Sequence, residues 1–125
     1  MASRRGARRT ALFLLYQWDV TGQPLASLYE GEVDPFAQQL AEEVVAGAEE
    51  LDRRISEASE GWPADRLGAL ERNVLRIGIR ELDRAEVPVE VAIDEAVTLA
   101  KRYSSDEAGR LVNGILGHIA KERAA

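Results

Sequence analysis

Four arginines stand close together at the start of the sequence and are the clearest candidates for binding chemistry. They are Arg4, Arg5, Arg8 and Arg9, and no acidic residue lies among the first nine positions. This basic arm, residues 1–9, carries +4, and because the whole chain carries −6, the other 116 residues carry −10. Guanidinium groups bind phosphate and carboxylate oxygens through paired N–H donors. A basic arm on an acidic body indicates a focused anion-binding site rather than a general coat for nucleic acid.

A second group of bases lies near the other end of the chain. Lys101, Arg102 and Arg110 flank the pair Ser104-Ser105. If the fold brings this serine joint near the first residues, these bases extend the arm into one patch. In complexes with single-stranded RNA, arginines on phosphates supply affinity, while stacking and base-edge contacts supply the choice of sequence.

Catalytic and metal-binding constellations are missing from the sequence. His118 is the only histidine and there is no cysteine, so a zinc site is not expected. Asp94 and Glu95 are adjacent in an expected helix and point about 100° apart, which fits surface charge better than a shared substrate. We find no Ser/His/Asp arrangement and no glycine-rich phosphate loop. We therefore expect a protein that is not an enzyme and needs no cofactor.

Length and composition indicate one globular domain. The chain has 125 residues, of which 46% are hydrophobic and 30% charged. The lack of cysteine fits a reducing cytoplasm. No apolar run approaches the roughly 20 residues that a membrane span needs. We expect a cytoplasmic protein with no membrane contact.

Helical periodicity runs through nearly the whole sequence, and no strand alternation is present. Apolar residues recur three and four positions apart in five expected helices: residues 3–20, 34–59, 68–85, 88–103 and 105–123. The expected fold class is therefore all-α. Ser3, Asp34 and either Ser104 or Ser105 are the expected N-caps. Trp62 is expected to anchor a loop against the core.

Small residues mark one face of the last expected helix. Gly109, Asn113 and Gly117 are four residues apart, and Gly114 lies beside the apolar face. Glycine inside a helix costs roughly 1 kcal/mol relative to alanine, so its presence indicates a close contact. We expect Gly114 or Gly117 to lie against another helix.

Several motifs resemble those of the NusB family of bacterial transcription antitermination factors. The densest are residues 91–97 (VAIDEAV), 99–101 (LAK) and 112–116 (VNGIL). The first residues are also similar, in Arg4-Arg5, Ala7-Arg8, Ala11 and Leu15-Tyr16. So is the central pattern of Glu71, Val74-Leu75-Arg76 and Glu81-Leu82. The resemblance covers roughly residues 3–120.

This resemblance implies a fold and a function. The family fold is all helical, with about seven helices in two small three-helix sub-bundles around a shared core. One non-catalytic RNA-binding domain would then span residues 1–125. Members bind the single-stranded boxA element of ribosomal RNA leader transcripts together with NusE, which is also a small-subunit ribosomal protein. The complex helps RNA polymerase to resist termination.

The resemblance also suggests which residues serve each partner. In the family the arginine-rich start belongs to the RNA-binding surface, so we expect RNA contacts from the arm and the serine joint: Arg4, Arg5, Arg8, Arg9, Lys101 and Arg110. The acidic body suits a basic protein, and Glu71 and Glu81 are the expected contacts with NusE, solvated charges or intramolecular ion pairs being the alternative. Family members often have an aromatic residue at the positions of Arg80 and Leu111, and Asn at that of Asp94.

Two other classes of protein stay open at this stage. A NusB-like domain also forms the N-terminal part of some ribosomal RNA cytosine methyltransferases, although no cofactor-binding domain follows in these 125 residues. A helical scaffold that binds only proteins is the second alternative, and RNA binding that is absent or insensitive to salt would favour it.

Overall fold

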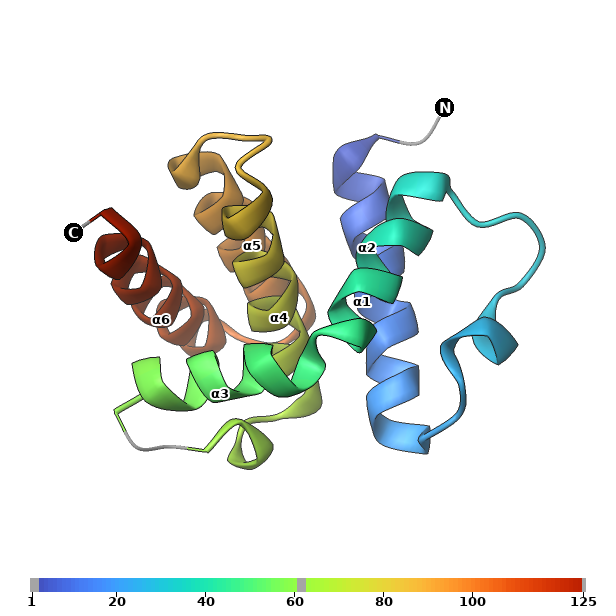
Figure 1. The fold of residues 1–125 in the computed structure, drawn as a ribbon, viewed down its shortest axis with the longest axis horizontal. Coiled ribbons are helices and arrows are strands. Elements are labelled where there is room, and N and C mark those ends of the chain that lie inside the picture. Colours follow the sequence, from blue (N-terminus) through green and yellow to red (C-terminus); the bar gives the residue numbers. More distant parts are fainter. Residues whose placement is uncertain (1–2, 61–62, 125) are drawn as a thin grey trace.

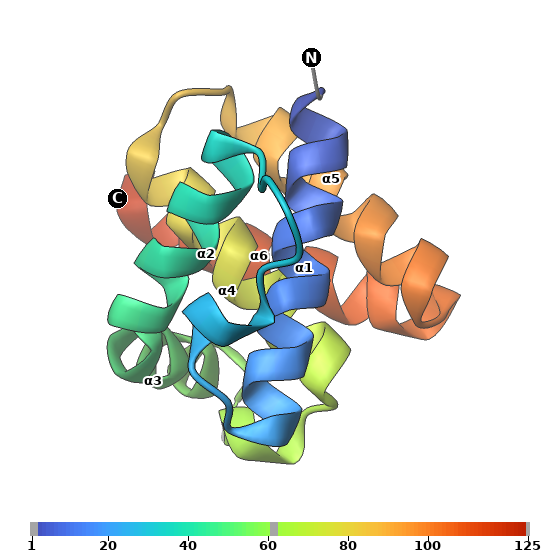
Figure 2. The ribbon, with the colours of Figure 1, turned by 90° about the vertical axis from the view of Figure 1, so that its right-hand side faces the viewer.

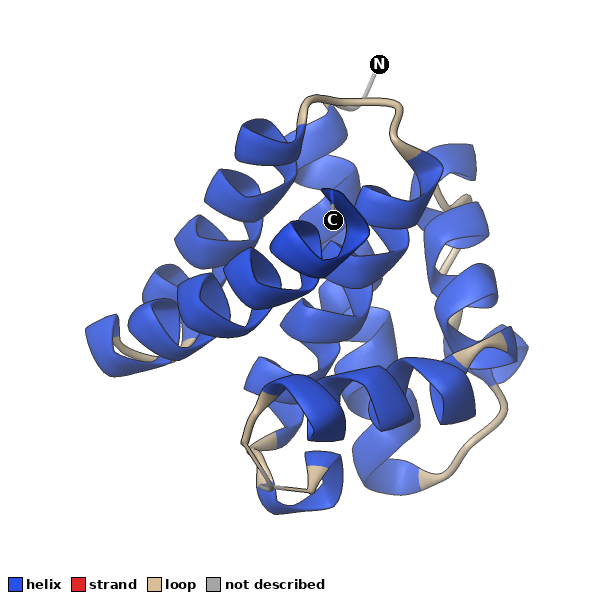
Figure 3. Ribbon diagram, turned by 60° about the vertical axis from the view of Figure 1, so that its left-hand side comes forward, coloured by secondary structure: helices blue, strands red, loops and turns tan. Residues whose placement is uncertain are grey.

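The computed structural model describes residues 3–60 and 63–124, and every regular element within them is helical (Figures 1 and 3). In chain order the elements are α1 (Arg4–Thr21), the 3-10 helix η1 (Leu25–Leu28), α2 (Pro35–Ala46), α3 (Ala48–Ala58), the 3-10 helix η2 (Ala64–Arg66), α4 (Ala69–Arg84), α5 (Val89–Tyr103) and α6 (Asp106–Ala124). The all-α prediction is confirmed, with six α-helices and two 3-10 helices in these residues where the resemblance implied about seven helices. No helix in this described part is long and apolar enough to cross a membrane. Trp62 lies outside the described residues.

Helix α4 is the centre of the molecule and contacts each of the other α-helices. Figure 1 shows α1 and α2 on one side of it and α6 on the other, with α5 behind it, while α3 lies across one end. Seen from the side in Figure 2, α1 runs the height of the molecule, and the chain that leads from α1 to α2 passes along it. Buried apolar side chains from all six helices form one shared core. Because α4 is surrounded, residues 73–79, 81 and 82 are all buried, and they include the polar side chains of Asn73, Arg76 and Glu81.

Side-chain caps begin three of the helices at predicted positions. Ser3 Oγ, Asp34 Oδ1 and Ser105 Oγ each accept a hydrogen bond from a backbone N–H two or three residues further on, at 2.9 to 3.2 Å. Such caps contribute about 0.5–2 kcal/mol each. Ser105, and not Ser104, makes the cap at the serine joint.

The prediction of one helix over residues 34–59 is wrong, because the chain bends at Gly47. This residue has φ −106° and ψ 13°, and it ends α2 and begins α3. The turn lets α3 leave the direction of α2 and place Leu51 and Ile55 against the core. Periodicity alone could not reveal the bend, since the apolar spacing continues through it.

Gly114 and Gly117 of α6 do not make the predicted close contact with another helix. A Cβ added at Gly114 or Gly117 would meet nothing within 4 Å, so this expectation is wrong. The tight approach is instead at Gly78 in α4, where an added Cβ would lie 2.6 Å from Leu116 Cδ1 and 3.5 Å from Ala96 Cβ. Gly78 lets α4 pack closely against both α5 and α6.

A polar network ties the end of α1 to α3 and α4. Asp19 accepts hydrogen bonds from Arg72 at 2.9 Å and from Asn73 and Arg76 at 3.0 Å. Arg76 also binds both carboxylate oxygens of Asp52 at 2.7 Å. Burial raises the pKa of Asp19, but the hydrogen bond from Arg72 and the charges of both arginines outweigh it, so this pKa lies below its ordinary value of 3.8.

Candidate nucleic-acid interface

A groove between α1 and α5 collects three of the six predicted RNA-binding residues, Arg5, Arg8 and Arg9. Its lining consists of Arg5, Arg8, Arg9, Glu95, Thr98, Leu99, Arg102 and Tyr103. The arginines of α1 reach it because positions three and four apart share one face of a helix. The expectation that the arm and the serine joint lie together is met by Arg102. Lys101 and Arg110 do not line the groove.

Three of the four arm arginines bind carboxylates of the protein itself. Arg8 is only 5% exposed, and its Nε donates to Glu81 Oε1 at 2.6 Å. Arg5 Nε donates to Glu95 Oε1 at 2.9 Å, and Arg8 Nη1 lies 3.9 Å from the other Glu95 oxygen. Arg4 pairs with Glu86 at 3.5 Å. These pairs join α1 to α4, to α5 and to the connection between them, which explains cations at the helix end that its dipole disfavours.

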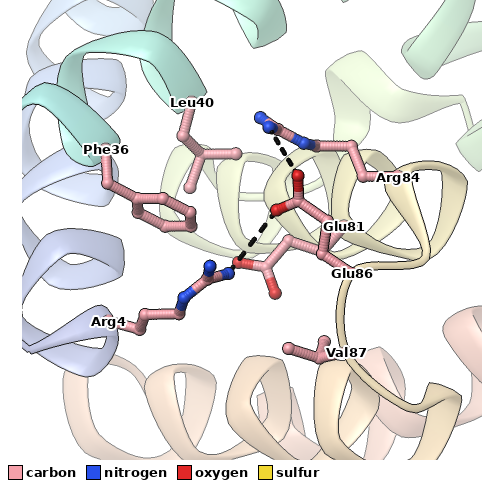
Figure 4. A pocket seen from close by; sticks show the side chains of 7 residues that line it. All are labelled: Arg4, Phe36, Leu40, Glu81, Arg84, Glu86 and Val87. Carbon is pink, nitrogen blue, oxygen red and sulfur yellow. Dashed lines mark hydrogen bonds and ion pairs between the residues drawn. The ribbon is translucent and has the colours of Figure 1, made fainter.

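Figure 4 shows the surroundings of Arg4, which lines a small hollow together with Phe36 and Glu86. The Arg4 guanidinium lies 4.6 Å from the ring centroid of Phe36, and Glu86 also accepts a hydrogen bond from Arg84 at 2.9 Å. Arg4 therefore helps to hold α1 against α2 and the chain after α4. Its side chain nevertheless stays half-exposed.

Six basic residues are exposed and make no ion pair within residues 3–60 and 63–124. Four of them, Arg9, Lys101, Arg102 and Arg110, are near the groove or the serine joint, while Arg66 in η2 and Lys121 in the last turns of α6 lie elsewhere. The Arg102 guanidinium lies 5.5 Å from the ring centroid of Tyr103. The stem of Lys101 lies where a Cβ of Gly109 would be, 2.6 Å from Lys101 Cγ. This places Lys101 against the start of α6, close in sequence to Arg110. Most of the unpaired positive charge in the described residues is thus in the groove and at the serine joint.

Exposed aromatic rings border the groove, and they are not among the site residues predicted from the sequence. Phe13 is 41% exposed and Tyr16 is 39% exposed. The rings of Phe13 and Tyr103 meet edge to face, with centroids 5.0 Å apart and planes at 83°. Arg9, Phe13 and Tyr16 follow each other at i, i+4 and i+7 on α1. That spacing was the available signal, but the unusually wide apolar face of this helix obscured it.

The two acidic residues expected to meet NusE lie in different environments. Glu81 is only 7% exposed and is bound by Arg8, so it faces the inside of the protein. Glu71, in the first turn of α4, is partly exposed and accepts a hydrogen bond from the Ser104 hydroxyl. The intramolecular alternative therefore describes Glu81, and Glu71 is the carboxylate of the two that a partner can reach.

The departures from the family pattern have local consequences. Arg80 donates to Glu43 at 3.1 Å, and Arg84 binds the same oxygen at 3.0 Å, which clamps α2 to α4. Burial raises the pKa of Glu43, but the two arginines and the hydrogen bond from Gln39 lower it by more, so this pKa lies below its ordinary value. Leu111 is exposed on α6 and offers no aromatic ring there.

Groups of three or more His, Asp or Glu side chains that could hold a metal ion do not occur in the described part of the chain. His118 instead lies 2.9 Å from Glu122, one turn along α6. The chemistry of this surface is therefore that of cations, aromatic rings and carboxylates.

Comparison with known proteins agrees with this picture. The sequence matches the NusB family over residues 5–121. The transcription antitermination protein NusB of Rubrobacter xylanophilus is 44% identical over 121 residues, which cover 91% of this chain and 87% of that protein. NusB of Solibacter usitatus is 38% identical over 98% of this chain and 91% of its own.

Solved structures show the same fold. The solution structure of NusB from Aquifex aeolicus has a TM-score of 0.82 and 35% identity, covering 99% of this chain and 91% of that one. A chain in the crystal structure of the antitermination factors NusB and NusE in complex with dsRNA has a TM-score of 0.82 and 34% identity, with 95% and 96% coverage. The family is non-enzymatic. Motifs, fold and relatives all agree, and the chain belongs to the NusB family of transcription antitermination proteins.

Proposed function

We propose that the protein binds the single-stranded boxA element of ribosomal RNA leader transcripts through the face formed by α1, α5 and the serine joint. It does so together with NusE, within the antitermination complex of RNA polymerase. The observation that carries this proposal is the position of unpaired Arg9 and Arg102 beside the exposed ring of Phe13 and the partly buried ring of Tyr103.

This arrangement suits single-stranded RNA for two physical reasons. Unpaired guanidinium groups neutralise phosphates and release counterions, which supplies affinity for any sequence. Aromatic faces stack on unpaired bases, with about 1–3 kcal/mol per base, and such bases are available only outside a duplex. Phe13 and Tyr16 lie on the same side of α1 as Arg9, so one RNA strand can meet charge and ring in succession.

The candidate residues divide into groups by their present contacts. Arg9 and Arg102, followed by Lys101 and Arg110, are free to contact phosphates. Arg4 and Arg5 are exposed but already paired, so RNA must compete for them. Arg8 is buried in its ion pair and positions α1 rather than touching RNA.

The proposal is tested by replacing Arg9 and Arg102 with Ala and titrating boxA RNA over a range of salt concentrations. We expect weaker binding and a slope of log K against log salt that is shallower by about 1.4, because about 0.7 is lost per phosphate contact on a single strand. Arg66→Ala is the matched control, since Arg66 is exposed in η2 near the opposite end of α1. An unchanged slope in the double variant would refute the proposal. A duplex of the same sequence and a scrambled strand show whether the site prefers the single strand.

The partner surface is proposed at Glu71, on the acidic body. The similar crystal structure is a complex of NusB with NusE and dsRNA, which supports a protein partner for this chain. A carboxylate that a basic protein can reach steers association and fixes orientation. Glu81, held by Arg8, acts indirectly by keeping α1 and α4 together.

A further inference from the structure

The groove between α1 and α5 holds one carboxylate among four arginines. Glu95 stands on α5 facing Arg5 and Arg8 of α1, and its side chain is only 16% exposed. Its two oxygens are divided between the two arginines, at 2.9 Å from Arg5 Nε and 3.9 Å from Arg8 Nη1. A mostly buried acid in a basic groove needs an explanation beyond solvation.

A carboxylate and a phosphate present similar chemistry to a guanidinium group. Both are anions that accept two N–H donors from one fork. Arg8 already has Glu81 at 2.6 Å, so Glu95 is the second carboxylate near it and the first for Arg5. The Arg5 side chain is 79% exposed, and an incoming RNA phosphate can reach the same donors that Glu95 now uses.

We propose that Glu95 is an internal substitute for an RNA phosphate, which occupies Arg5 in the free protein and is displaced when RNA binds. This inference rests on the proposed RNA-binding function and adds a specificity-determining residue to it. A phosphate at this position must displace the Glu95 carboxylate or lie beside it. A polyanion without stacking bases therefore gains little binding free energy from Arg5. RNA whose bases stack on the rings near Phe13 supplies the additional free energy that displacement requires.

The test compares Glu95→Gln with the matched control Glu90→Gln. Both remove one negative charge from α5, but Glu90 is exposed, forms no ion pair in the described residues, and lies five positions earlier, about 140° around the helix. At about 0.1 M salt we expect Glu95→Gln to bind boxA RNA about two- to fivefold more tightly than the parent, as fits release of one surface ion pair. Glu90→Gln should change the affinity less than 1.5-fold, since screening weakens distant charges over about 10 Å.

A double-mutant cycle with Arg5→Ala identifies the competition itself. In the Arg5→Ala background, Glu95→Gln should give no more gain than Glu90→Gln does. Conversely, Arg5→Ala should cost little RNA affinity in the parent and clearly more in the Glu95→Gln background. Circular dichroism confirms that each variant is folded. Should Glu95→Gln unfold, the single variant Arg5→Ala still tests the proposal, because it must cost little RNA affinity while Glu95 is present.

Two results overturn the proposal. Weaker RNA binding by Glu95→Gln would mean that Glu95 orients Arg5 for RNA, and an effect equal to that of Glu90→Gln would mean that Glu95 is only one charge among others. Failure of the RNA function is recognised separately, because the parent would then bind no boxA RNA with or without NusE. In that case, elution from a heparin column still tests whether Glu95 competes with an anionic ligand for Arg5. The Glu95→Gln variant must elute at higher salt than Glu90→Gln, and elution at the same salt refutes the proposal.

Discussion

Replacing Arg8 with Ala should destabilise the protein severely, although Arg8 belongs to a segment that looks like a solvent-exposed basic arm. The side chain lies between α1 and α4, and its Nε is 2.6 Å from Glu81 Oε1. Removing it leaves the Glu81 carboxylate, itself only 7% exposed, without its closest partner. Breaking a buried pair from one side costs about 3–5 kcal/mol, because the remaining charge is neither paired nor hydrated.

This free energy converts into a large shift of the melting temperature. An unfolding entropy of about 2.1 cal/mol/K per residue gives ~0.26 kcal/mol/K for a chain of 125 residues. A loss of 3–5 kcal/mol then lowers the midpoint by roughly 11–19 °C. The adjacent Arg9→Ala, which removes an exposed and unpaired guanidinium, should stay within about 0.5 kcal/mol of the parent.

Urea and thermal unfolding followed by circular dichroism measure both variants. The double variant Arg8→Met with Glu81→Leu should recover most of the loss, because an apolar pair of similar volume avoids the cost of burying charge. If Arg8→Ala unfolds at the same denaturant concentration as Arg9→Ala, the pair does not hold α1 to α4 and the reasoning fails.

Three further predictions concern other parts of the molecule. Asp19→Asn should lower the free energy of unfolding at pH 7 by about 1–3 kcal/mol. Because the folded-state pKa of Asp19 lies below 3.8, the parent protein loses this stabilisation as the pH falls from 3.8 through that lower pKa. The unfolding free energies of parent and variant, measured from pH 6 to 2, should therefore converge at low pH, and a constant difference between them contradicts the assignment. Glu71→Lys should slow association with purified NusE at low salt more than Glu49→Lys, an exposed reversal on α3, and equal rates would place the partner surface elsewhere. Gly114→Ala and Gly117→Ala should each raise the free energy of unfolding by about 0.5–1 kcal/mol, because nothing lies within 4 Å of the added methyl group; a drop in melting temperature would show a contact there.

Helix positions and caps were predictable because local chemistry determines them. Ser3 and Asp34 cap helices wherever the tertiary fold places those helices, and the apolar stripes followed from periodicity alone. The bend at Gly47 was missed because glycine can be tolerated within a helix, and only the packing of α3 across the end of α4 shows that the chain turns there.

The candidate site was only partly predictable because ion pairs are formed between residues far apart in the sequence. Arg8 and Glu81 are 73 positions apart, and Arg5 and Glu95 are 90 apart. Charge counting therefore could not distinguish the bound arginines from the free Arg9. Similarly, a glycine that permits close packing is recognised only once its neighbour is known, as at Gly78 and not at Gly114.

The early start of α1 has a consequence for the way an RNA strand is received. The helix already begins at Arg4, and its first turns are fastened to α4 and α5 before any ligand arrives. Arginine-rich segments that are disordered lose conformational entropy when they order on nucleic acid, and this lowers their affinity. Here the segment is preorganised, so binding should leave the far-ultraviolet circular dichroism unchanged and show a small heat-capacity change. Recognition then resembles the docking of a strand onto a rigid face, with the side chains of Arg5 and Glu95 as the parts that move.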